Sequence, residues 1–116
     1  MKFNPNVPIY LQIMDEFKKD IVSGTLSPGS KVKSVRELAL EYEVNPNTVQ
    51  RALSELEREG LVHANRTAGR FISEDQELLN QVAHAKAAAI VSKFIADIRQ
   101  LGYNDEEIIN LIKQNL

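Results

Sequence analysis

Two short amphipathic helix patterns lie between Ser34 and Gly60 with almost no chain separating them. Glu37 follows Ser34 by three residues, a capping box that predicts the start of the first helix. Asn45 is a favoured N-cap, and Pro46 after it predicts the start of the second helix. Because only two residues separate the two patterns, the helices must cross steeply, as in a helix-turn-helix. Both repeat apolar residues with helical spacing: Val35, Leu38, Ala39 and Tyr42, then Val49, Ala52, Leu53 and Leu56.

The flanking segments complete a small domain. A helix pattern begins near Pro8 and stops at Gly24, and its apolar residues predict packing in a core. After the helix pair, Leu61–Ala64 and Arg70–Ser73 are predicted to be short strands joined by the polar loop Asn65–Gly69. Such a hairpin beside a helix-turn-helix is a wing. Residues 1–73 are therefore predicted to form a winged helix-turn-helix domain.

The remaining residues, 74–116, have the pattern of a helical tail. Ser73 and Gln76 predict a second capping box, ahead of a helix of roughly 25 residues. Asn104 then caps a short helix over Asp105–Gln114. Two such helices offer each other too little surface, so we expect a homodimer and a mainly α fold with a small β-wing. The expected dimerisation residues repeat at four-three spacing: Ala87, Val91, Phe94, Ile98 and Leu101.

Composition restricts the classes of function. The chain has 116 residues and no cysteine, so no disulfide or thiolate metal site can form. Its two histidines, His63 and His84, are too far apart in the sequence to suggest a metal site. No nucleophile elbow, phosphate loop or paired-carboxylate motif is present, so neither an enzyme nor a cofactor is expected. The sequence has no leader pattern and no apolar stretch of membrane length, so we expect a cytoplasmic protein without a membrane partner.

The charge is unevenly divided along the chain. Residues 1–73 contain ten Lys/Arg against nine Asp/Glu, a net charge of +1, whereas residues 74–116 contain four against seven, a net charge of −3. Affinity for nucleic acid depends on a local basic face more than on the total charge. The weak net charge nevertheless keeps open a winged helix that binds only other proteins.

Five blocks of this sequence occur in the order typical of one family. They are Pro8-Ile9-Tyr10-Leu11-Gln12, Gly24-x-Leu26-x-Pro28-Gly29, Ser34-Val35-Arg36-Glu37-Leu38-Ala39, Val44-Asn45-Pro46-Asn47-Thr48-Val49-x-Arg51-Ala52 and Leu56-Glu57-x-Glu59-Gly60-Leu61. With these blocks, the segment from Val7 to Ile72 resembles the GntR family of bacterial transcription regulators, and the short tail resembles its YtrA-type subfamily. Two positions depart from the family pattern: Val32-Lys33 replaces Leu-Pro, and Thr67-Ala68-Gly69-Arg70 replaces Gly-x-Gly-Thr at the wing tip.

The resemblance implies which residues bind DNA. The matching positions are Arg36, Asn45, Asn47, Thr48 and Gln50 on the helix pair, Arg66 and Thr67 on the wing, and Lys33 beside the backbone phosphates. Their chemistry is suitable, because Arg pairs with guanine, Asn and Gln pair with adenine, and Thr contacts phosphate or a thymine methyl. An arginine on the wing suits a narrow minor groove. Structural roles compete at two positions: Asn45 is also a helix cap, and Arg51 is alternatively an i+4 partner of Glu55.

The leading hypothesis is a homodimeric repressor of transcription whose partner is a double-stranded DNA operator. Its two recognition helices would enter successive major grooves of a pseudo-palindrome. The first alternative is the protein-interaction module named above. The second is a sensor that binds an unknown small-molecule effector in a pocket at the seam between two tails.

Overall fold

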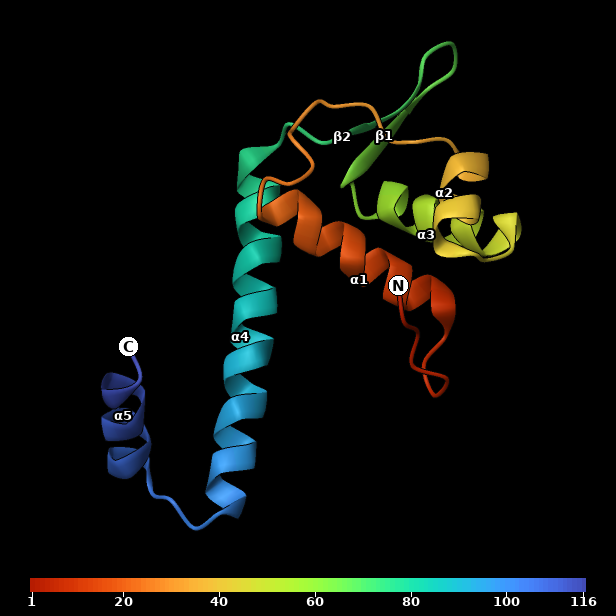
Figure 1. Ribbon diagram of the computed structural model, residues 1–116. Coiled ribbons are helices and arrows are strands. Elements are labelled where there is room, and N and C mark those ends of the chain that lie inside the picture. The colour runs from red at the N-terminus through yellow and green to blue at the C-terminus, as the bar shows by residue number, and fades with distance from the viewer. The chain divides into compact units, whose positions relative to one another are not determined.

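The helices and strands follow the sequence patterns closely. A computed structural model describes all of residues 1–116 (Figure 1). The predicted fold class, mainly α with a β-wing, is confirmed, and each strand differs from its predicted range by one residue. The elements are α1 (Ile9–Val22), α2 (Val35–Tyr42), α3 (Pro46–Arg58), β1 (Val62–Asn65), β2 (Gly69–Ile72), α4 (Gln76–Gln100) and α5 (Asp105–Gln114).

The wing hairpin has a third segment at its base. β1 and β2 pair antiparallel over their full length. Lys31 forms a further antiparallel bridge with Phe71, and the Val32 N–H donates to the Arg70 carbonyl over 2.8 Å. The sequence patterns did not predict this pairing. It ties the segment before α2 directly to the wing.

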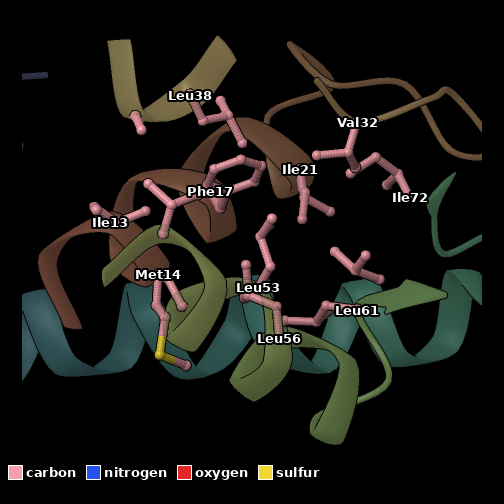
Figure 2. Close-up of a cluster of buried hydrophobic side chains, with 14 of the residues drawn as sticks. Ile13, Met14, Phe17, Ile21, Val32, Leu38, Leu53, Leu56, Leu61 and Ile72 are labelled. Atoms are coloured by element: carbon pink, nitrogen blue, oxygen red, sulfur yellow. The ribbon is translucent and has the colours of Figure 1, made fainter. Parts of the chain in front are cut away.

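A single apolar core holds the first compact unit of the chain, Met1–Val82. The buried side chains come from α1, α2, α3 and the start of α4, together with Val32, Leu61, Val62 and Ile72 in and beside the wing hairpin. Figure 2 shows that α1 and α3 contribute many of them. Ile13, Leu53 and Leu56 have no exposed surface, and burying an aliphatic side chain of this kind stabilises the fold by about 2 kcal/mol. Leu79 of α4 belongs to the same core, so this unit includes the first turns of α4. The expected domain boundary after residue 73 stays a prediction.

The start of α4 differs from the predicted capping box. Asp75 is the residue that caps the helix, because its Oδ1 accepts from the Leu78 N–H over 3.2 Å. The Ser73 hydroxyl accepts instead from the Asp75 N–H over 3.0 Å, and the Gln76 side chain bonds forward along the helix. Ser73 is fixed by the wing, since its own N–H donates to the Leu61 carbonyl over 3.0 Å. Pairing with the hairpin therefore delays the helix beyond the predicted cap.

The second compact unit, Ala83–Leu116, contains the rest of α4 and α5. Asn104 caps α5, as predicted. It does so through a capping box with Glu107. Arg99 and Asp105 form an ion pair of 2.8 Å across the turn between the two helices. Ile108 is the single buried side chain of this unit.

Candidate nucleic-acid interface

The first turn of α2 presents an unpaired arginine. The predicted capping box is confirmed, with the Glu37 N–H donating to Ser34 Oγ over 3.1 Å and the Ser34 N–H donating to the Glu37 carboxylate over 3.3 Å. This cap fixes the direction of the first turn. Arg36 is exposed on that turn and makes no hydrogen bond or ion pair. Its guanidinium is available to an anionic or hydrogen-bonding ligand.

The turn between α2 and α3 depends on a left-handed residue. Glu43 has φ 57°, and the Val44 N–H donates to the Ala39 carbonyl over 3.0 Å. Asn45 then caps α3, its Oδ1 accepting from the Asn47 N–H over 2.8 Å. The competing structural role of Asn45 is therefore confirmed, while its DNA contact stays a prediction.

The exposed face of α3 carries polar side chains. Its opposite face is fully buried through Val49, Ala52, Leu53 and Leu56. Asn47 and Gln50 are exposed, and Gln50 makes a single long hydrogen bond of 3.3 Å, to Ser54 one turn later. Thr48 is half-buried. Because the buried face fixes the rotation of α3, Asn47 and Gln50 are held outward, and the only internal hydrogen bond that either side chain makes is the long Gln50–Ser54 bond.

The wing tip is a short polar turn. Asn65 Oδ1 accepts from both the Thr67 N–H and the Thr67 hydroxyl, each over 3.0 Å, which shapes the turn. Gly69 has φ 102°, and the stem of Lys31 lies so close that a Cβ there would be 3.2 Å from Lys31 Cε. Arg66 is exposed and has no partner. Thr67 therefore builds the tip, and Arg66 projects from it.

Two shallow grooves lie on either side of the first turn of α2. One groove, of about 600 Å³, joins this turn to the wing and is lined by Lys31, Lys33 and Thr67 among others. The other, of about 610 Å³, joins Arg36 to Pro46 at the start of α3. Val35 lines both. The structure thus brings the predicted residues of α2, the start of α3 and the wing onto neighbouring surfaces.

Lys33, predicted to lie near a phosphate, already has a partner. Its Nζ lies 2.8 Å from Glu41, at the other end of α2. The hydrogen bond to Glu41, followed by the attraction of the same carboxylate, raises the pKa of Lys33 above its usual value. A phosphate would have to replace Glu41 before Lys33 could contribute its charge.

Two arginines have partners that local sequence patterns did not identify. The suggested pairing of Arg51 with Glu55 is wrong: the Arg51 guanidinium carbon lies 3.8 Å from the centre of the Tyr10 ring, and Glu55 pairs with Arg58 instead. Tyr10 is distant in sequence, so helical spacing could not reveal the contact. The second arginine, Arg70 of β2, forms an ion pair with a glutamate of α3.

The expected dimerisation residues lie in the second unit, four of them on α4 and Leu101 directly after its last residue. Ala87, Val91 and Leu101 are exposed in the single chain, and Phe94 and Ile98 are half-buried. Within residues 1–116, no three His, Asp or Glu side chains are close enough to hold a metal ion. No helix is both long and apolar enough to traverse a bilayer.

Comparison with known proteins identifies the family. Residues 9–72 match the model of the bacterial regulatory proteins of the gntR family. The chain belongs to the GntR family. Among its relatives, the HTH-type transcriptional regulator YhcF of Bacillus subtilis is 39% identical over 97% of this chain and 93% of its own length. The HTH-type transcriptional repressor YtrA of the same organism is 37% identical over 94% of this chain and 85% of its own length, which confirms the YtrA-type resemblance.

Solved structures of GntR proteins agree with this assignment. A GntR family transcriptional regulator from Listeria monocytogenes has a TM-score of 0.88 and 39% identity, covering 97% of this chain and 98% of its own. The DNA-binding domain of AraR in complex with operator ORR3 has a TM-score of 0.56 and 26% identity, covering 63% of this chain and 86% of its own. The protein is a DNA-binding transcription regulator of the GntR family, not an enzyme.

Proposed function

We propose that the protein is a homodimeric repressor that recognises a pseudo-palindromic operator in double-stranded DNA. The observation that carries this proposal is the set of exposed polar side chains near the N-terminal ends of α2 and α3, of which Gln50 alone makes one long internal hydrogen bond. Arg36 has no internal partner, and the side chains of Asn47 and Gln50 point away from the buried face of α3. Residues at the start of a recognition helix are the ones that reach base edges in a major groove.

Each side chain then has a role that fits its chemistry. Arg36 is suited to a guanine, and Asn47 and Gln50 to adenines, through paired hydrogen bonds. Asn45 and Thr48 would contact the DNA from the start of α3. The remaining residues, Arg66, Thr67 and Lys33, would contact the minor groove and the flanking phosphates beside the wing.

The tail supports the homodimer. Ile90 of α4 is 71% exposed and Leu101, directly after α4, is 72% exposed, so the single chain leaves these two large aliphatic side chains of the tail in water. A second copy would cover them along the seam formed by Ala87, Val91, Phe94, Ile98 and Leu101. An operator with two half-sites matches a protein with two-fold symmetry. The name of the relative YtrA, a repressor, supports repression as the outcome.

The experiment is to select bound fragments from the host genome with the wild type and with Arg36→Ala, at two salt concentrations. A shared palindrome that Arg36→Ala binds about tenfold or more weakly would support a specific dimeric regulator. Salt-sensitive binding without any shared sequence would contradict specificity. Fragments that share one half-site without an inverted repeat would contradict the dimeric operator. Fusing the recovered site to a reporter gene then decides between repression and activation.

The tail also supports a second candidate, a sensor of a small molecule. A cavity of about 250 Å³ lies between α4 and α5, lined mainly by Val91, Ile95, Ile108 and Ile112, with the Arg99–Asp105 ion pair at its edge. Apolar walls with one charged pair suit a small, mostly apolar effector. Screening small apolar acids and amines by thermal shift tests this candidate. A ligand whose effect is lost in Ile108→Ala would support it, and covering of the cavity in a dimer structure would contradict it.

A further inference from the structure

One ion pair links the wing to the recognition helix. Arg70 Nε of β2 contacts Glu57 Oε1 of α3, and the two side chains are only 22% and 30% exposed. A charge pair that is partly shielded from water is weakened less by salt than a fully exposed pair. Arg70 stands where the family's wing motif usually has threonine. The link therefore uses a position at which this chain departs from the family's usual wing motif.

The two residues join the parts that the proposed function assigns to two different grooves. Glu57 follows Gln50 by seven residues, so the two lie on the same side of α3, two turns apart. Arg70 follows Gly69, the residue at which the wing turn closes into β2. Beyond this point residues 65–69 are exposed, and Arg66 projects from them without a partner. Glu57 and Arg70 therefore connect the C-terminal end of α3 to the base of the wing tip.

The pairing also determines what Arg70 can do. An arginine that contributes affinity by neutralising a phosphate must bring an uncompensated charge to the DNA. Arg70 meets a carboxylate within its own chain, and an unpaired Glu57 on this side of α3 would repel the DNA backbone. The pair has no net charge. Apart from neutralising Glu57, Arg70 can therefore contribute to binding through the geometry of the wing.

We propose that the Glu57–Arg70 ion pair sets the angle of the wing relative to α3, so that Arg66 reaches the minor groove while α3 occupies the neighbouring major groove. Arg70 is then a positioning residue that does not touch DNA. This inference rests on the proposed function for the role of Arg66. The link between wing and helix itself can be tested without DNA.

The first test measures coupling between the link and the wing tip. Operator affinity is compared for the wild type, Arg66→Ala, Glu57→Gln and the double variant. We expect Arg66→Ala to weaken binding about tenfold in the wild type. In the Glu57→Gln background the same change should weaken it about twofold, because a misplaced wing has already lost the contact. Equal effects of Arg66→Ala in both backgrounds would overturn the proposal.

Glu59→Gln is the matched control. Glu59 lies two residues from Glu57 and pairs with Lys18 of α1 over 2.8 Å, so it has no link to the wing. Removing either glutamate takes one negative charge from the end of α3, which by itself favours DNA binding. Glu59→Gln should therefore leave the effect of Arg66→Ala near tenfold. A loss of coupling in Glu59→Gln as well would overturn the specific role of Glu57.

Exchanging the two charges separates positioning from contact. The double variant Glu57→Arg, Arg70→Glu restores an ion pair, and we expect it to recover at least about half of the affinity, on a logarithmic scale, that Arg70→Glu alone loses. If Arg70 contacts a phosphate, the exchange would not restore binding. In that case Arg70→Thr would also lower the slope of log affinity against log salt by about one. Either result would overturn the positioning role.

NMR relaxation of the free protein tests the link between wing and α3 independently of DNA binding. Backbone amides of Arg66, Thr67 and Ala68 should become more mobile on the nanosecond scale in Glu57→Gln, and should not in Glu59→Gln. A melting curve of each variant confirms that the fold persists. Unchanged wing mobility in Glu57→Gln would overturn the link even if operator binding is intact. Failure of the wild type to bind any operator, together with the expected change in mobility, would contradict the proposed function and leave the link supported.

Discussion

The two compact units of this chain differ in how much of their apolar surface one copy covers. In Met1–Val82, the aliphatic side chains of Ile13, Val49 and Leu53 have no exposed surface. In Ala83–Leu116, large aliphatic side chains remain mostly in contact with water, and only Ile108 is buried. The first unit has a core of its own. The second has apolar surface that one copy of the chain does not bury.

This difference shows that a segment can form a helix through its intrinsic propensity without having a core to pack against. The middle of α4 contains Ala87, Ala88 and Ala89, residues with the highest intrinsic helix propensity. The tail can therefore form its helix before it has anything to pack against. The winged helix unit depends on tertiary packing, whereas the stability of the tail is expected to depend on association and hence on protein concentration.

The largest expected effect breaks the core of the first unit. Leu53→Ala, at a position without exposed surface, should lower the free energy of unfolding by about 3 kcal/mol, because it leaves a cavity. Leu101→Ala is the matched change in the tail, where 72% of the side chain is exposed, and should cost less than about 1 kcal/mol in dilute solution. Urea denaturation at low protein concentration measures both. Equal losses would remove the distinction between the units.

The next effect concerns association of the tail. Val91→Glu places a charge within the expected seam and should raise the dissociation constant of the dimer at least about tenfold. Ser92→Glu, one position further along the exposed side of α4, adds the same charge outside that seam. Sedimentation equilibrium gives the dissociation constants. The melting temperature of the wild type should also rise with concentration, and that of Val91→Glu should not. Identical behaviour of the two variants would exclude this seam.

A smaller effect reports on the first unit alone. Burial raises the pKa of Tyr42 to about 12, with a further contribution from Glu41, whereas the unfolded chain releases this proton near 10.0. Between these values the folded state keeps a proton that the unfolded state has lost, so stability falls as pH rises through this window. The loss should be about 1 kcal/mol, because solvent reaches part of the ring. Tyr42→Phe should flatten this part of the profile of stability against pH. An unchanged profile would show that the loss of stability does not come from the raised pKa of Tyr42.

The smallest effect compares two surface ion pairs of the same length. Lys33–Glu41 lies in the first unit and Lys93–Asp97 in the tail, each over 2.8 Å, and in each the hydrogen bond to the carboxylate raises the pKa of the lysine. Glu41→Gln should free Lys33 for a phosphate and raise operator affinity about threefold, with a steeper salt dependence. Asp97→Asn removes the same charge from the tail and should change affinity less. Equal gains would mean that only the net charge matters.

The sequence was sufficient wherever structure depends on near neighbours. The capping box at Ser34, the cap at Asn45 and the short helix that follows Asn104 are all local, because side chain and backbone within one turn satisfy each other. Apolar periodicity likewise identified the buried face of α3. The exposed face carrying Asn47 and Gln50 followed as its complement.

Contacts between distant segments could not be predicted in this way. Arg51 stacks on Tyr10, and Ser73 is held by the wing instead of capping α4. Lys31 pairs with Phe71 although no strand pattern surrounds it. For Arg51 and Ser73 a local alternative, an i+4 ion pair or a capping box, was chemically reasonable. A tertiary contact replaced it, and helical or strand periodicity contains no information about such contacts.

The left-handed turn at Glu43 has a consequence for how such a protein can change. A residue with a Cβ costs about 1 kcal/mol in this conformation, and the exposed Glu43 side chain makes no contact that offsets it. Asparagine tolerates the conformation better, so Glu43→Asn would gain stability without altering any exposed residue of α3. Under the proposed function, new operator preferences would arise through substitutions on the exposed face of α3. The stability gained by Glu43→Asn could offset the cost of such substitutions, so the protein could change its DNA target and still fold.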